Sequence, residues 1–151
     1  MANAVQAQLR FGPDTYVVSP AATAGANQVD GGRLVEFDGA NPGTIKLAVV
    51  DSAKWLGVAL QLALPTNPST LTIPSGHPAV IFEDIPSEVG VAWVGEFDLT
   101  ATNAVLAQGD IVYCGAGGLI QKATTTGRPV GIVLEPGGIA ANGTGRVRLF
   151  I

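Results

Sequence analysis

The chain has few residues of the kinds that perform chemistry. Its 151 residues include one cysteine, one histidine and only 13% charged side chains. A single cysteine excludes an internal disulfide and any zinc site built on several cysteines. The formal net charge of −4 argues against nucleic-acid binding, because nucleic-acid binders present clustered positive charge. We therefore expect no cofactor, no metal and no nucleic-acid partner.

Long apolar runs are also missing. No stretch approaches the roughly 20 apolar residues of a membrane-spanning helix, so no membrane partner is expected. Apolar residues never recur at helical spacing over three turns. Instead, 20 glycines and 10 prolines separate short β-rich runs, a pattern typical of all-β folds. We predict a small all-β sandwich or barrel of short strands.

The chain divides into an arm and one domain. Residues 1–13 show no periodicity and are expected to form an extended N-terminal arm. Residues 14–151 are expected to form a single β domain with its own hydrophobic core. Hydrophobic residues make up 47% of a chain with little charge, which indicates surface that is hidden against other subunits.

Two segments, 31–60 and 108–134, resemble each other. Both open on a glycine and a charged residue and continue as a β-rich run, Leu34–Phe37 in one and Ile111–Cys114 in the other. Both then make a glycine turn and close on GVAL or GIVL. This predicts an internal duplication, with two β-meanders packed as equivalent halves of one barrel. The alternative is that two unrelated meanders with glycine turns look alike.

Two of the expected strands stand out, one by its length and the other by its regular alternation. The longest candidate runs over 89–99, with glycines as expected bulges. The cleanest alternation lies over 145–151, where Arg146 and Arg148 share the polar face. A strand this regular is expected to be paired, since an open edge would invite aggregation.

No catalytic constellation stands out, and we expect a protein that is not an enzyme. Cys114 is expected to be a buried strand residue, although a cysteine hydrolase that pairs it with His77 is an alternative. Gly115–Gly118 lacks the lysine of a phosphate-binding loop and is expected to be a hairpin turn. The aromatic residues are spread along the chain and do not indicate a stacking platform. Glu96 and Asp98 share one strand face, where an arginine of a neighbour could meet them.

Four motifs follow one another in the second half of the chain: GVAWVGEFDL at 90–99, AQGDIVY at 107–113, RPVGIVL at 128–134 and GRVRL at 145–149. Their order resembles that of the small capsid decoration (head cement) proteins of tailed bacteriophages. The resemblance implies a compact β-barrel or β-tulip-like sandwich. It also implies a structural virion protein, made in the host cytoplasm, that lies on the outer surface of the capsid. It implies two partners, the major capsid protein and the chain itself as a homotrimer.

The role implied by this resemblance is to bridge capsid subunits and so stabilise the mature shell. A ligand that binds only the mature lattice stabilises it by mass action. Our candidate interface residues are Arg10 and Phe11 in the arm and Arg146 and Arg148 on the last strand. The alternative function is a non-catalytic β-sandwich module, such as a carbohydrate-binding or adhesin domain, which would be monomeric and carry an exposed aromatic patch.

Overall fold

A computed structural model describes residues 13–20, 28–64, 87–122 and 126–150. Arg10 and Phe11 of the arm and the histidine His77 lie outside these residues. The described residues form ten strands and a single turn of 3-10 helix. The predicted all-β class is therefore confirmed.

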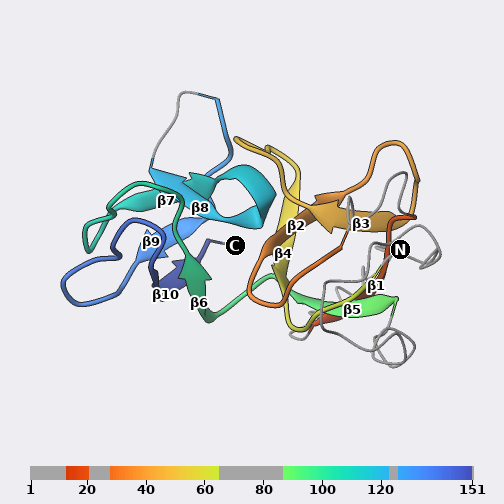
Figure 1. The fold of residues 1–151 in the computed structure, drawn as a ribbon, viewed down its shortest axis with the longest axis horizontal. Helices are drawn as coiled ribbons and strands as arrows, with labels where there is room; N and C mark the ends of the chain where they lie inside the picture. The colour runs from red at the N-terminus through yellow and green to blue at the C-terminus, as the bar shows by residue number, and fades with distance from the viewer. Residues whose placement is uncertain (1–12, 21–27, 65–86, 123–125, 151) are drawn as a thin grey trace, which may run out of the picture.

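The first five strands close into a barrel, which we call the first unit (Figure 1, red to green). Its strands are β1 (Asp14–Val18), β2 (Leu34–Phe37), β3 (Thr44–Leu47), β4 (Trp55–Ala59) and β5 (Glu88–Ala92). Their spatial order is β1-β3-β2-β4-β5. Strand β1 closes the barrel, because it pairs with β5 on one side and, in parallel, with β3 on the other.

The other five strands form a second sheet, which we call the second unit (Figure 1, green to blue). Its strands are β6 (Glu96–Thr100), β7 (Ile111–Cys114), β8 (Ile120–Lys122), β9 (Gly131–Val133) and β10 (Thr144–Leu149). Their order is β6-β10-β9-β7-β8. The outer strands meet in a parallel bridge between Ala101 and Ile120, and the Thr102 amide donates to the Ile120 carbonyl at 2.8 Å.

The two units share one strand plan. Strands β1 to β5 take the same places, in the same chain order, as β6 to β10. The register is also the same. Equivalent cross-strand pairs are Phe37–Ile45 with Cys114–Ile120, Val35–Gly57 with Val112–Gly131, and Val18–Ile45 with Ala101–Ile120. The repeat therefore extends beyond 31–60 and 108–134 and includes every strand that the structure describes.

The expectation that the two meanders form halves of one barrel is wrong. Each meander supplies the three neighbouring strands of its own unit, β3-β2-β4 or β8-β7-β9. A three-stranded meander still has two open edges, and the flanking segments of the chain provide the strands that pair with them. The glycine turn Gly115–Gly118 does join β7 to β8 as a hairpin, and it contains the 3-10 turn η2 (Ala116–Gly118).

The expected long strand over 89–99 is divided in two. Strand β5 ends at Ala92 and β6 begins at Glu96. Between them Gly95 has a φ of 126°, which side-chain-bearing residues rarely adopt. The chain passes here from the first unit to the second, so one continuous apolar run serves two sheets.

Two hydrophobic clusters form the core. The interior of the first unit holds one cluster: Val18, Val29, Val35, Ile45, Ala59, Ala63, Val89 and Val91. The other cluster fills the second unit and also contains residues from the outer face of the first unit, namely Leu34, Ala48, Trp55 and Val58. The two units therefore share this second cluster. Strand β4 is buried on both faces, in agreement with its apolar sequence.

Backbone contacts also join the units. The Gly118 amide of η2 donates to the Ala48 carbonyl at 2.9 Å, and the Asp51 amide donates to the Cys114 carbonyl at 2.9 Å. A Cβ at Gly118 would overlap the Leu34 carbonyl oxygen, so η2 can lie against β2 only with glycine here (Figure 1). Its φ of 71° also favours glycine.

The equivalence of the units predicts equal effects at equivalent glycines. A Cβ at Gly57 would overlap the carbonyl oxygen of Ala92, and one at Gly131 would overlap that of Arg148. Each oxygen belongs to the backbone of a paired strand and cannot move freely. We expect Gly57→Ala and Gly131→Ala each to lower the free energy of unfolding by about 1–3 kcal/mol, the usual cost of overpacking.

The matched control for these variants is Gly39→Ala. Gly39 is exposed, and a Cβ there would have no neighbour within 4 Å. Its free energy of unfolding should stay within about 0.5 kcal/mol of the wild type. Urea unfolding measures all three variants, and a large effect at only one of the two strand glycines would contradict the shared plan.

Candidate functional site

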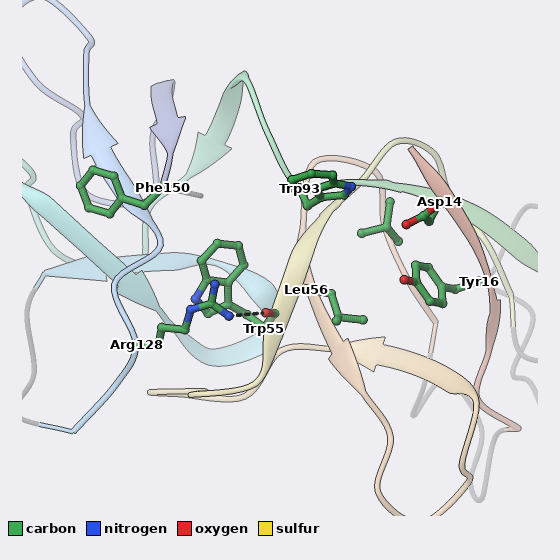
Figure 2. A pocket seen from close by; sticks show the side chains of 8 residues that line it. Asp14, Tyr16, Trp55, Leu56, Trp93, Arg128 and Phe150 are labelled. Carbon is green, nitrogen blue, oxygen red and sulfur yellow. Dashed lines mark hydrogen bonds between the residues drawn. The ribbon is translucent and has the colours of Figure 1, made fainter. Parts of the chain in front are cut away.

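A groove of about 290 Å³ lies where the two units meet, and we call it the junction groove (Figure 2). Four aromatic residues line it, Tyr16, Trp55, Trp93 and Phe150. They come from β1, β4, the β5–β6 connection and the end of β10, so they are far apart in the sequence. The sequence did not indicate this aromatic cluster, because only the closure of the first unit brings its members together.

Trp55 lies at the centre of the junction. It is 3% exposed, and the guanidinium carbon of Arg128 lies 4.5 Å from its ring centroid (Figure 2). Arg128 Nη1 also donates to the Trp55 carbonyl at 3.4 Å. This cation–π contact covers one face of the indole ring. Trp55 is thus an anchor between the units, and its covered face is not open for stacking on a ligand.

The remaining wall of the junction groove is largely apolar. Leu56 and Val91 line its floor, and Asp14 at the start of β1 supplies the one carboxylate among the lining residues. Figure 2 shows Asp14 and Tyr16 across the groove from Arg128. The described lining therefore offers apolar contact, the hydroxyl of Tyr16 and two opposite charges, those of Asp14 and Arg128.

Cys114 belongs to the core. Its side chain is fully buried, and burial raises the pKa of the thiol to about 12, with a smaller contribution from the negative charges of Glu36 and Asp51. The thiolate is the reactive form of cysteine, and a thiol with this pKa stays protonated at neutral pH. The alternative of a cysteine hydrolase therefore has no activated nucleophile, and its proposed partner His77 lies outside the described residues.

A polar cluster joins the end of β1 to the β2–β3 turn. The carboxylate of Asp38 accepts hydrogen bonds from the Asn41 side chain at 2.8 Å, from the Ser19 hydroxyl and from the Ala40 amide at 3.1 Å. These bonds, first that of Asn41 and then that of Ser19, lower the pKa of Asp38 to about 2. So acidic a carboxyl is a poor general base, and we assign the cluster to the structure of the turn.

At the positions equivalent to this polar cluster, the second unit has uncharged residues. By register, Thr102 corresponds to Ser19 and Gly115 to Asp38. A Cβ at Gly115 would overlap the methyl group of Thr102, so the methyl occupies the space that a larger residue would need. The backbone plan is therefore the same in both units while the side-chain chemistry differs.

The two interface candidates that the structure describes lie on β10. Arg148 donates from Nε and Nη2 to the same oxygen of Glu96, at 3.1 and 2.6 Å, so Glu96 is paired within its own chain. Arg146 is exposed, and its backbone amide donates to Glu135 at 3.0 Å. Neither arginine lies in the junction groove. Contact of either with another subunit stays a prediction.

Comparison with known proteins adds no relative. No protein-family model matches the chain, and no curated protein is significantly similar to it. Among the described residues, no group of three or more histidine, cysteine, aspartate or glutamate side chains is placed to hold a metal ion. No helix in the same part of the chain is long and apolar enough to span a membrane.

The burial of Cys114 predicts an unreactive thiol. Native protein should resist iodoacetamide at neutral pH, because its pKa of about 12 leaves almost no thiolate and the sulfur is shielded. The same protein unfolded in guanidinium chloride should be alkylated at once. Mass spectrometry follows both reactions, and rapid labelling of the native protein would reopen the hydrolase alternative.

The low pKa of Asp38 predicts a stability difference that depends on pH. Asp38→Asn removes the charged acceptor and should cost about 1–3 kcal/mol of unfolding free energy at pH 7. The folded pKa of about 2 lies below the ordinary 3.8, so the carboxylate stabilises the fold above pH 3.8. This contribution is lost as pH falls toward 2, and the two proteins should then converge in stability.

Asp98→Asn is the control for this experiment. Asp98 is an exposed aspartate on β6, and its replacement should change the unfolding free energy by under about 0.5 kcal/mol. Urea unfolding at several pH values gives both comparisons. A difference between Asp38→Asn and wild type that stays constant down to pH 2 would show that the charge of Asp38 is not what stabilises the turn.

Proposed function

We propose that the chain is a structural protein of a tailed-phage particle that binds the outer surface of the capsid. It bridges subunits of the major capsid protein, stabilises the mature shell and performs no catalysis. Many identical weak contacts, repeated over the lattice, provide the stabilisation without an active site. The partners are the capsid subunits and further copies of the chain.

One observation carries this proposal. The four motifs that resemble the decoration family lie within or beside β6, β7, β9 and β10. These strands occupy consecutive places in the second unit, in the order β6-β10-β9-β7. Apart from residues 90–92, which end β5 of the first unit, the motifs lie in or beside strands of the second unit, so the resemblance is concentrated in that unit.

An exposed apolar surface beside β3 supports a role in binding other proteins. Val49 and Val50 are 51% and 49% exposed, and they line a shallow hollow together with Ala116 and Gly117 of the second unit. Large apolar side chains exposed side by side are typical of a surface that a partner covers. We assign this surface to contact with the capsid.

The second candidate function is a small ligand-binding module, and the aromatic lining of the junction groove favours it. Two features weaken it. Arg128 covers one face of Trp55, and the groove of about 290 Å³ is at the small end of ligand pockets, which typically span roughly 300–1,000 Å³. A monomer that binds glycans in titration calorimetry would favour this module over the capsid role.

Removal of the N-terminal arm tests the capsid role. A variant that lacks residues 1–13 keeps every described strand, so its melting temperature should stay close to that of the full chain. Its occupancy on undecorated shells should fall, because the arm with Arg10 and Phe11 is our candidate for capsid contact. Sedimentation of shells with bound protein measures occupancy.

Full-length protein is the reference, and Gly39→Ala, which alters an exposed position of the domain, is the control that should still bind. Unchanged occupancy after removal of the arm would exclude the arm as the contact. Failure of the full-length protein to bind any mature phage shell, together with its absence from purified particles, would overturn the capsid role itself.

A further inference from the structure

The shared strand plan gives residues of one unit counterparts in the other. The cross-strand pairs that define the assignment are Asp14–Val91 with Phe97–Val147, Val35–Gly57 with Val112–Gly131, and Val58–Ala92 with Ile132–Arg148. It follows that β4 aligns with β9, β5 with β10 and β1 with β6. Contacts made by one unit can then be compared with those made by the other.

One end of the second unit is filled from within the chain. Leu99, Val130 and Leu149 at this end are at most 4% exposed. They share a hydrophobic cluster with Leu34 and Val58, which belong to the outer face of the first unit. The outer face of β2 and β4 thus acts as a plug that closes the end of the second unit.

Within the described residues, the corresponding end of the first unit is open. The counterparts of Leu99, Val130 and Leu149 are Tyr16, Leu56 and Trp93, and all three line the junction groove. Each is only half-buried in the chain, although its counterpart is fully buried. The junction groove of the first unit is therefore equivalent to the end of the second unit that the plug fills.

The plug also has an equivalent with nothing packed on it in the described structure. Ile111 and Ile132 face each other across β7 and β9, as Leu34 and Val58 do across β2 and β4. Leu34 is 0% exposed, whereas Ile111 is 45% exposed. Ile132 is half-buried, and Pro129, the counterpart of Trp55, is exposed. In the described structure, the outer face of β7 and β9 therefore exposes Ile111 at the position where the first unit buries Leu34.

We propose that chains associate head to tail, with the Ile111–Ile132 face of one copy seated in the junction groove of the next. The contact repeats between chains the plug that Leu34 and Val58 form within each chain. Each surface combines apolar side chains with one pair of opposite charges, Asp14 and Arg128 in the groove and Arg148 and Glu96 beside Ile132. Each also matches by register a surface that the fold already buries against the other. The proposal deepens one part of the proposed function, the association of copies, by naming the two surfaces that meet. Its evidence is the register of the strands, so it can fail while capsid binding holds.

The geometry of this contact is heterologous, because two different surfaces of the chain meet. Such contacts close into a ring when the rotation between copies permits and otherwise continue as a chain. A two-fold dimer, in which one surface meets its own copy, is a different arrangement. Complementation between variants distinguishes the two arrangements.

The first test measures self-association of the full chain by sedimentation velocity over a wide range of protein concentration. Wild-type protein should form oligomers. Ile111→Asp places a carboxylate in the apolar contact and should weaken association about tenfold or more. Val105→Asp is the matched control, because Val105 is 70% exposed and lies in neither surface, and it should associate like the wild type.

Two variants test the groove. Trp93→Asp puts a charge in the groove. Asp14→Arg changes the charge and bulk at the half-buried first residue of β1 and serves in case the first variant fails to fold. Each should weaken association about tenfold or more, like Ile111→Asp. Thermal unfolding followed by circular dichroism verifies that each variant is folded.

The decisive experiment mixes the two kinds of variant. A chain with Ile111→Asp retains its groove, and a chain with Asp14→Arg retains its apolar face, so one heterologous contact remains between them. The mixture should form one-to-one dimers with nearly wild-type affinity, although neither variant associates alone. Wild-type protein that stays monomeric, loss of association in the Val105→Asp control, or a mixture that fails to pair would overturn the proposal.

Discussion

Burial of one face of the first unit in the open end of the second is the constraint on which the structure depends. A five-stranded barrel this small has room for few side chains, so its ends must be covered to exclude water. Leu34 and Trp55 provide the cover, and complete burial of such side chains contributes about 1.5–3 kcal/mol each. The cation–π contact of Arg128 with Trp55 and the backbone bond from Gly118 to Ala48 hold the same junction together.

The repeated units show which part of the plan is essential. Hydrogen-bond register is the same in both, down to glycines at positions 57 and 131 where a neighbouring backbone leaves no room for a Cβ. Side-chain chemistry is free to vary, since the pair Ser19 and Asp38 carries a charge that its counterparts lack. Close approach of two backbone segments therefore restricts which residue can stand at a position, and it does so more strongly than the polar contacts at the turns.

Local features of the fold could be predicted from the sequence, whereas its closure could not. Alternation and glycine turns indicated most of the strands, the burial of Cys114 and the hairpin at Gly115–Gly118, because these depend on neighbours in the chain. The parallel pairing of β1 with β3 joins segments that are distant in the sequence, and no local sequence pattern predicts it. The aromatic groove depends on the pairing of β1 with β5 and on the contact between the two units. The single run at 89–99 hid a boundary because both sheets need apolar residues there.

Apolar side chains at the exposed ends of both units favour the proposed association between copies of the chain. Arrays of repeated units usually end in polar faces, because the outermost units have no neighbour to cover them. Here the first unit keeps an apolar, aromatic mouth, and the second keeps an exposed isoleucine at the position where the first buries Leu34. This arrangement supports the proposed association of one copy with the next. Such continuity suits a protein that covers a lattice of identical subunits, since each added contact then reinforces its neighbours.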